Sequence, residues 1–178
     1  MPGFDKNARL STLINEESLQ ARIQELGAQI RAEYGDEPVT CIGVLKGSFL
    51  FMADLVRAID GPVRCEFLGV SSYQGGTRST GVVRITHDLK QSVENQHCLL
   101  IEDIVDTGLT MEYLLRMLRL RNPASLKIAS LLDKPSNRKV EVDIDYVGFT
   151  IPDEFVVGYG LDLQGFYRNL PYIAVYHP

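Results

Sequence analysis

The sequence predicts an α/β fold in which a mainly parallel sheet is flanked by helices. One observation is a series of mostly apolar runs of strand length, at 39–45, 98–101 and 125–132. A second is that stretches with apolar residues at helical spacing separate these runs, at 49–59 and 111–118. A third is that the first two runs end in polar, glycine-containing turns. Strands alternating with helices indicate right-handed βαβ units, whose ligands bind at the carboxyl ends of the strands.

Length and composition indicate one globular domain, 1–178, because 178 residues with 45% hydrophobic and 23% charged residues are typical of such a domain. The net charge of −5 argues against general nucleic-acid binding, whose surfaces are usually basic. We see no secretory h-region and no run of about 18 apolar residues, so we expect no membrane attachment and a cytoplasmic protein. Cys41, Cys65 and Cys98 lie far apart in strand-like runs, which favours reduced core thiols.

The first elements are a packing helix, a buried strand and a second helix. Asn15 can cap a helix whose acidic first turn suits the helix dipole and whose apolar face continues to Gly35. The strand at 39–45 then ends in Lys46-Gly47-Ser48, which opens the helix at 49–59. A strand, a glycine turn and a helix indicate an anion site at this sheet edge, although a lysine that merely decorates a turn would give the same pattern.

A polar, glycine-rich loop interrupts the next pair of strands. A half-exposed strand with alternating apolar and charged residues begins at Val63, and its predicted inner face includes Cys65 and Phe67. Residues 82–88 make the return strand. The segment between them, 71–81, is too long for a tight turn, so it is either a lid over an active site or a plain hairpin tip.

The stretch from Cys98 to Met111 combines a strand, a polar turn and a helix start, and it carries the clearest chemistry. Its acids have the spacing E-D-x-x-D, at Glu102, Asp103 and Asp106, and a Thr-Gly-x-Thr turn follows at 107–110. Free N–H groups at a helix N-terminus, with two hydroxyls, can bind a phosphate. The acids would repel that phosphate, so they must face sugar hydroxyls, a divalent cation or a proton to be removed. A phosphorylated ribose has all three needs.

Two segments, E-D-I-V-D-T-G-L-T at 102–110 and I-P-D-E-F-V-V-G-Y-G-L-D at 151–162, resemble the type I phosphoribosyltransferases in their bacterial hypoxanthine-guanine branch. The resemblance implies the fold of that family, with a small hood region and a flexible lid loop. Some members have lysine where this chain has Leu109, so the loop amides should carry more of the phosphate contact here. The residues that the resemblance assigns to ribose 5-phosphate are Glu102, Asp103, Asp106, Thr107, Gly108, Leu109 and Thr110.

The resemblance implies further roles. Asp106 is the expected general base at purine N7, and Lys46 and Gly47 match a pyrophosphate loop in which the peptide before the lysine is often cis. Arg168 is a further candidate for pyrophosphate. At the purine, the resemblance assigns Lys134 to the 6-oxo group, Phe155 to stacking on the ring, and Val156 to pairing with the base through its backbone. Asp162, at the purine end, would hold Mg²⁺ together with Glu102 and Asp103. Ser72 and Tyr73 would belong to the lid.

The activity that the resemblance implies is purine salvage by a Mg²⁺-dependent glycosyltransferase. It would move the 5-phosphoribosyl group of phosphoribosyl pyrophosphate to hypoxanthine, and to guanine, giving IMP or GMP and pyrophosphate. Because a lysine donates but never accepts, Lys134 favours a 6-carbonyl over the amino group of adenine. Family habit and the apolar helix after Gly47 suggest a homodimer or homotetramer. Two alternatives stay open: a regulator that senses nucleotides and binds RNA or DNA, and an enzyme with another acceptor, such as xanthine or a pyrimidine.

Overall fold

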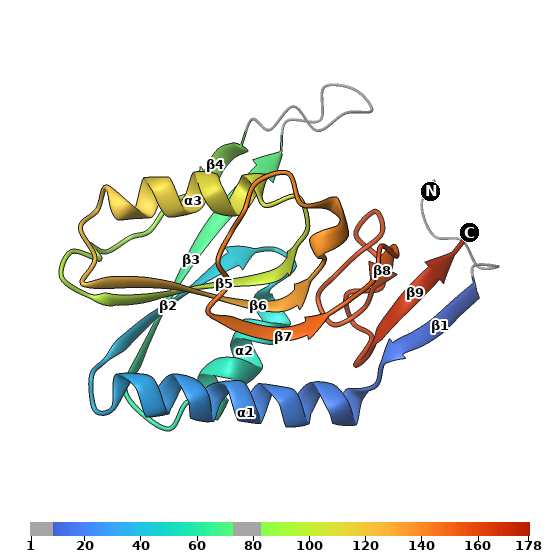
Figure 1. The fold of residues 1–178 in the computed structure, drawn as a ribbon, viewed down its shortest axis with the longest axis horizontal. Coiled ribbons are helices and arrows are strands. Elements are labelled where there is room, and N and C mark those ends of the chain that lie inside the picture. The colour runs from blue at the N-terminus through green and yellow to red at the C-terminus, as the bar shows by residue number, and fades with distance from the viewer. Residues whose placement is uncertain (1–8, 73–82) are drawn as a thin grey trace.

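A six-stranded sheet forms the centre of the structure, a computed structural model that describes residues 9–72 and 83–178. The strand order is β4-β3-β2-β5-β6-β7, and helices lie on both faces (Figure 1). All neighbouring pairs are parallel except that β4 runs antiparallel to β3 at one edge. The strands are β2 (Val39–Leu45), β3 (Val63–Ser72), β4 (Val83–His87), β5 (His97–Val105), β6 (Ser125–Asp133) and β7 (Tyr146–Thr150).

Two helices, α1 (Glu16–Tyr34) and α2 (Phe49–Ala58), cover one face of this sheet, and α3 (Leu109–Arg119) covers the other (Figure 1). Asn15 caps α1 as predicted, because its Oδ1 accepts the Ser18 N–H at 2.8 Å. Gly35, with a φ of 55°, ends that helix. The last helical element is a short 3-10 turn, η1 (Pro135–Asn137), which follows β6.

Each face of the sheet has its own hydrophobic core, and β5 contributes to both. Leu99 and Ile101 pack beneath α1 and α2, whereas Cys98 and Leu100 pack beneath α3. Successive side chains of a strand point to opposite faces, so burial of both faces explains the unbroken apolar run. This two-sided packing fixes β5, and the acids that follow Ile101 therefore emerge at the carboxyl edge of the sheet.

The hood is a second sheet, of three strands in the order β1-β9-β8, together with the loop at 158–170. Its strands are β1 (Arg9–Ile14), β8 (Val156–Val157) and β9 (Ile173–His177), and all pairs are antiparallel. The hood packs against the carboxyl edge of the main sheet, since a Cβ placed on Gly160 would lie 2.0 Å from the Gly47 carbonyl oxygen. The resemblance predicted a hood; hydrophobic patterning did not predict these strands.

Most predicted elements agree with the structure to within one residue at each end. The helix predicted at 49–59 stops at Ala58 because Ile59 is extended, with a ψ of 109°. The predicted inner face of β3 is wrong: Cys65 is exposed and Phe67 is 38% exposed. The prediction of three core thiols is therefore wrong for Cys65, whereas Cys41 and Cys98 are buried and all three are free.

The predicted lid falls mostly on residues that the structure does not describe. Ser72 is the last residue of β3, and Tyr73 lies outside the described residues. The return strand, β4, is described from Val83. None of the described helices is both long enough and apolar enough to span a membrane.

Candidate active site

A cleft of about 470 Å³ lies at the carboxyl ends of β2, β3 and β5, where the sequence predicted that ligands bind. The hood closes one side of it. Four separate segments of the chain contribute to its walls. The cleft brings together seven of the predicted site residues, which are Lys46, Gly47, Glu102, Asp103, Thr110, Asp162 and Arg168.

A smaller hollow of about 100 Å³ adjoins the turn between β5 and α3. Asp106, Thr107, Gly108 and Thr110 line it, and Leu109 is the first residue of α3. Gly108 has a φ of 84° and no side chain caps the helix, so the N–H groups of its first turn have no capping acceptor. These N–H groups and the positive end of the helix dipole favour an anion at this position.

The Lys46 loop touches the acid pair directly. The Leu45–Lys46 peptide is cis, as the resemblance predicted, and Lys46 is exposed to the cleft. A Cβ on Gly47 would lie 1.5 Å from Asp103 Oδ2, so the carboxylate rests against the glycine backbone. Only glycine leaves room for the Asp103 carboxylate there, and this close approach explains why position 47 is glycine.

The neighbouring acids Glu102 and Asp103 differ in environment. Glu102 is only 7% exposed, and its burial, followed by the charge of Asp103, raises the pKa of its carboxyl well above the usual range. The Asp103 N–H donates to Glu102 Oε1 at 3.2 Å, and Asp103 Oδ1 accepts the Ile104 N–H at 3.0 Å. A cation beside this pair would favour the ionised form of Glu102.

Three carboxylates that could ligate a metal, Glu102, Asp103 and Asp162, line the same cleft. Within residues 9–72 and 83–178 no His, Cys, Asp and Glu side chains are grouped tightly enough to enclose a metal ion. Magnesium, however, usually takes one or two carboxylates and completes its octahedron with water and substrate phosphates. The donor set fits that mode of binding and does not form an all-protein cage.

Arg168 and Asp162 join the hood to the cleft. Their side chains form an ion pair at 2.5 Å, and Arg168 Nη1 donates to the Gly160 carbonyl at 2.5 Å. Asp162 Oδ2 also accepts the Gly165 N–H at 2.6 Å. Residues predicted to serve pyrophosphate and Mg²⁺ are therefore partners of each other in this structure.

Lys134 is a nearly buried cation between two carboxylates. It is 8% exposed, and its Nζ lies 3.5 Å from Asp106 Oδ2 and 3.1 Å from Asp153 Oδ1. Lys134, and then Asn137, lower the pKa of the Asp153 carboxyl. The other oxygen of Asp106, Oδ1, is buried without a hydrogen-bond partner among the described residues, so one acceptor of this carboxylate is unsatisfied.

The segment after β7 presents an aromatic face. Phe155 is 52% exposed, and its ring lies edge-on to Tyr176, with centroids 6.1 Å apart. Val156 is buried in β8, where it pairs with Val175 of β9. An exposed ring held on a short strand can stack on a planar ligand.

Sequence reasoning missed Asp133, Arg138, Asp153 and Gly160. Arg138 donates to the backbone carbonyls of Val105 and Asp106 and pairs with Asp133. The available signal was a cluster of charged residues directly after a buried strand, but a polar stretch of this kind is also typical of an ordinary loop. Only the folded arrangement shows what these side chains contact.

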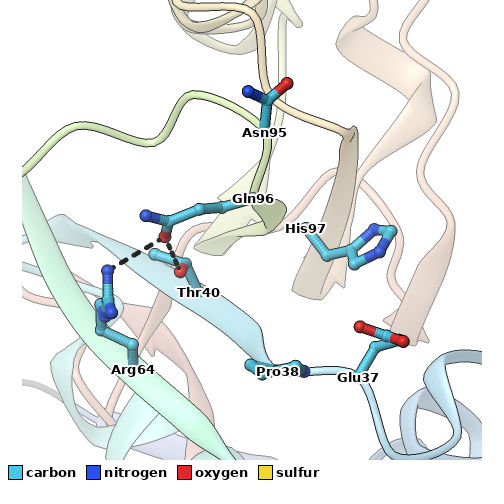
Figure 2. A pocket seen from close by; sticks show the side chains of 7 residues that line it. All are labelled: Glu37, Pro38, Thr40, Arg64, Asn95, Gln96 and His97. Carbon is cyan, nitrogen blue, oxygen red and sulfur yellow. Dashed lines mark hydrogen bonds between the residues drawn. The ribbon is translucent and has the colours of Figure 1, made fainter.

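A second hollow, of about 260 Å³, lies at the opposite ends of the same strands, where β2, β3 and β5 begin (Figure 2). Its polar side chains bond to one another: Gln96 Oε1 accepts from Thr40 Oγ1 at 2.6 Å and from Arg64 Nη1 at 3.3 Å. His97 Nδ1 lies 2.8 Å from Ser125 Oγ. This mutual satisfaction distinguishes it from the smaller hollow at the turn between β5 and α3, where Asp106 Oδ1 has no partner among the described residues.

Comparison with known proteins identifies the family. Residues 11–164 match the phosphoribosyl transferase domain. The chain is 52% identical over 164 residues to a hypoxanthine-guanine phosphoribosyltransferase of Staphylococcus epidermidis, with 92% of each chain covered. A solved hypoxanthine phosphoribosyltransferase of Staphylococcus aureus aligns with a TM-score of 0.91 and 50% identity, over 94% of this chain and 91% of the other. A hypoxanthine-guanine phosphoribosyltransferase of Bacillus anthracis aligns with a TM-score of 0.90 and 43% identity, over 97% and 100%. The chain therefore belongs to the phosphoribosyltransferase family, in its hypoxanthine-guanine branch.

Proposed function

We propose that this protein transfers the 5-phosphoribosyl group of phosphoribosyl pyrophosphate to N9 of hypoxanthine, and of guanine, forming IMP or GMP and pyrophosphate. The observation that carries this function is the meeting of an anion-binding turn, an acid pair and a loop lysine in one cleft. A sugar that bears phosphate at one end and pyrophosphate at the other needs these groups together. Holding both substrates in one orientation supplies much of the barrier reduction.

The turn at 107–110 would hold the 5′-phosphate through its N–H groups and the hydroxyls of Thr107 and Thr110. Glu102 and Asp103 would face the ribose hydroxyls, for which carboxylates are suitable acceptors. Lys46 and Arg168, which both line the cleft, would bind the pyrophosphate, and Gly47 lets the lysine loop approach Asp103. The geometry thus supports a sugar phosphate held from two sides.

Magnesium is part of the proposal. Asp162 would hold it together with Glu102 and Asp103, and the bound ion would neutralise the oxygens of the departing pyrophosphate. Arg168 pairs with Asp162, so a pyrophosphate bound to this ion would also lie beside Arg168.

Asp106 is the proposed general base, which takes or shares the N7 proton as N9 attacks the sugar. Its partnerless Oδ1 supports this role, because no donor among the described residues competes with the purine for this oxygen. Lys134 lies 3.5 Å from Asp106 and would donate to the 6-oxo group. A purine with an amino group at this position would leave the lysine unsatisfied, which disfavours adenine.

Phe155 and Val156 complete the proposed base site. The exposed ring of Phe155 would stack on the purine, and stacking on an aromatic side chain is worth about 1 to 3 kcal/mol per base in other proteins. Val156 would pair with the base through its backbone. Ser72 and Tyr73 would belong to a loop that closes over the site, and Ser71 supports this position because it already lines the cleft.

We further propose a homodimer or homotetramer of a single-domain chain acting in the cytoplasm. Exposed aromatic side chains on α2 and β3, at Phe49 (40%) and Phe67 (38%), support an apolar contact between copies. Free thiols are the expected state in a reducing compartment. Light scattering after size-exclusion chromatography would measure the assembly, and a monomer at micromolar concentration would contradict it.

The direct test is to assay pyrophosphate release from phosphoribosyl pyrophosphate and Mg²⁺ with hypoxanthine, guanine, xanthine and adenine in turn. We expect turnover with hypoxanthine and guanine, little with adenine, and none when Mg²⁺ is chelated. Turnover with xanthine alone would identify xanthine, and not hypoxanthine or guanine, as the purine substrate. No turnover with any purine, by protein that binds ribose 5-phosphate, would refute the transferase function.

A further inference from the structure

We infer that Arg138 is a positioning residue that sets the direction of the phosphate-binding amides. It holds the carbonyl side of the turn at 105–107, so that the N–H side faces the hollow. The inference rests on the proposed function, because that function assigns the 5′-phosphate to this turn. It adds a residue outside both sequence motifs.

The contacts of Arg138 show how it holds the turn. Its Nε donates to the Asp106 carbonyl at 3.0 Å, and its Nη2 donates to the Val105 carbonyl at 3.2 Å. The same guanidinium pairs with the carboxylate of Asp133. The two charged side chains are only 10% and 19% exposed, so the cation is largely withdrawn from water and held by three acceptors.

The backbone on either side of Arg138 continues the same contact. The N–H groups of Lys139 and Val140 donate to the Thr107 carbonyl at 2.9 and 3.2 Å. The Lys134 N–H donates to the Val105 carbonyl at 3.0 Å. Three consecutive carbonyls, at 105, 106 and 107, are therefore all held by the segment 134–140.

Peptide geometry connects those carbonyls to the phosphate site. In a trans peptide the C=O and the following N–H point in opposite directions. The three held carbonyls thus turn the N–H groups of Asp106, Thr107 and Gly108 away from the segment 134–140. In the described part of the chain none of these three N–H groups donates a hydrogen bond, and all three residues line the hollow. Successive amides arranged in this way form a binding site for an anion.

Gly108 shows how closely the segment lies behind the turn. A Cβ at this position would lie 2.3 Å from the Val140 carbonyl oxygen and 3.1 Å from Arg138 Cδ. Its φ of 84° also favours glycine. Because position 109 is leucine and offers no charge, the orientation of the amides matters more for anion affinity in this chain.

The test compares Arg138→Met with a matched control, Arg22→Met. Arg22 has the same chemistry away from the cleft: it donates to the carbonyls of Gly148 and Val147 at 3.1 and 2.7 Å and pairs with Glu25 at 2.6 Å. Calorimetry would give the Kd for ribose 5-phosphate, steady-state kinetics the KM for each substrate, and thermal unfolding the Tm. These readouts separate a loosened phosphate site from a general loss of stability.

We expect Arg138→Met to raise the Kd for ribose 5-phosphate and the KM for phosphoribosyl pyrophosphate about tenfold or more. The KM for hypoxanthine should stay within about twofold, since the base site keeps its own side chains. Arg22→Met should lower the Tm without changing either phosphate constant. A Kd for Arg138→Met that stays within about twofold of wild type would overturn the inference.

Arg138→Lys keeps the charge but loses the planar fork, and it carries the test alone if the methionine variant does not fold. We expect it to raise the Kd for ribose 5-phosphate severalfold. An unchanged Kd would assign the effect to charge alone and refute the positioning role. Wild-type protein that binds ribose 5-phosphate but transfers nothing to a purine would refute the proposed function and leave this inference standing.

Discussion

Asp106→Asn should separate chemistry from binding at this site. Asparagine preserves the shape of the side chain and the backbone carbonyl that accepts from Arg138. It removes the carboxylate whose Oδ1 has no partner among the described residues. Loss of a general base costs about 10²- to 10⁴-fold in rate, which corresponds to about 2.7 to 5.5 kcal/mol of transition-state stabilisation. We therefore expect kcat to fall by that factor while the Kd for IMP changes little.

The cost in stability should be small. The ion pair with Lys134 spans 3.5 Å, the Asp106 side chain is 39% exposed, and Lys134 keeps Asp153 at 3.1 Å. Such a pair contributes no more than about 1 kcal/mol, or about 2–4 °C in Tm for a chain of this size.

Single-turnover measurements with hypoxanthine would report the chemical step without product release. Asp153→Asn is the control, because it removes the other carboxylate of Lys134 and leaves the base in place. An unchanged single-turnover rate for Asp106→Asn would remove Asp106 from the mechanism. An equal loss in the control would assign the effect to Lys134 instead.

Four further predictions concern separate parts of the candidate site. Lys134→Ala should lower the ratio of kcat/KM for hypoxanthine over adenine at least about tenfold, because the 6-oxo group loses its donor; an unchanged ratio rejects that assignment. Gly47→Ala should lower kcat/KM for phosphoribosyl pyrophosphate more than about 100-fold, since the new Cβ displaces the Asp103 carboxylate, and wild-type kinetics would contradict this. Folded protein binds the Glu102 proton more tightly than the unfolded chain does, so the free energy of unfolding should fall as pH rises from the ordinary pKa of 4.5 to the raised folded value. Urea unfolding of Glu102→Gln should show a flatter pH dependence, and equal slopes would refute the shift. Asp162→Asn should raise the Mg²⁺ concentration for half-maximal activity severalfold, whereas an unchanged Mg²⁺ titration would exclude Asp162 as a ligand.

Patterning predicted the elements whose apolar residues form an unbroken run or recur at a helical period. β2 and β5 are covered on both faces, and α1 buries one stripe, so their sequences carry a clear signal. The first half of β3 departs from its predicted burial: among the described residues β4 pairs only with the second half, from Gly69 to Ser72, and leaves the first half as an exposed edge. The two residues of β8 and the largely exposed β1 are too short or too polar to show a period.

The candidate site was predicted where it lies in continuous motifs and missed where it depends on contacts between segments. The run from Glu102 to Thr110 could be interpreted from its residue types alone. The pairing of Lys134 with two carboxylates, those of Asp106 and Asp153, joins residues distant in sequence. Arg138 likewise depends on the backbone carbonyls that it meets, and no side-chain pattern encodes which carbonyls those will be.

The contact of Gly160 with the Gly47 carbonyl has a thermodynamic consequence. Backbone atoms touch there without an intervening flexible side chain, so a displacement of the hood must also displace the lysine loop. Occupancy of the proposed base site and of the proposed pyrophosphate site would then be energetically linked. Such linkage is reciprocal, so each ligand changes the affinity of the other by the same factor.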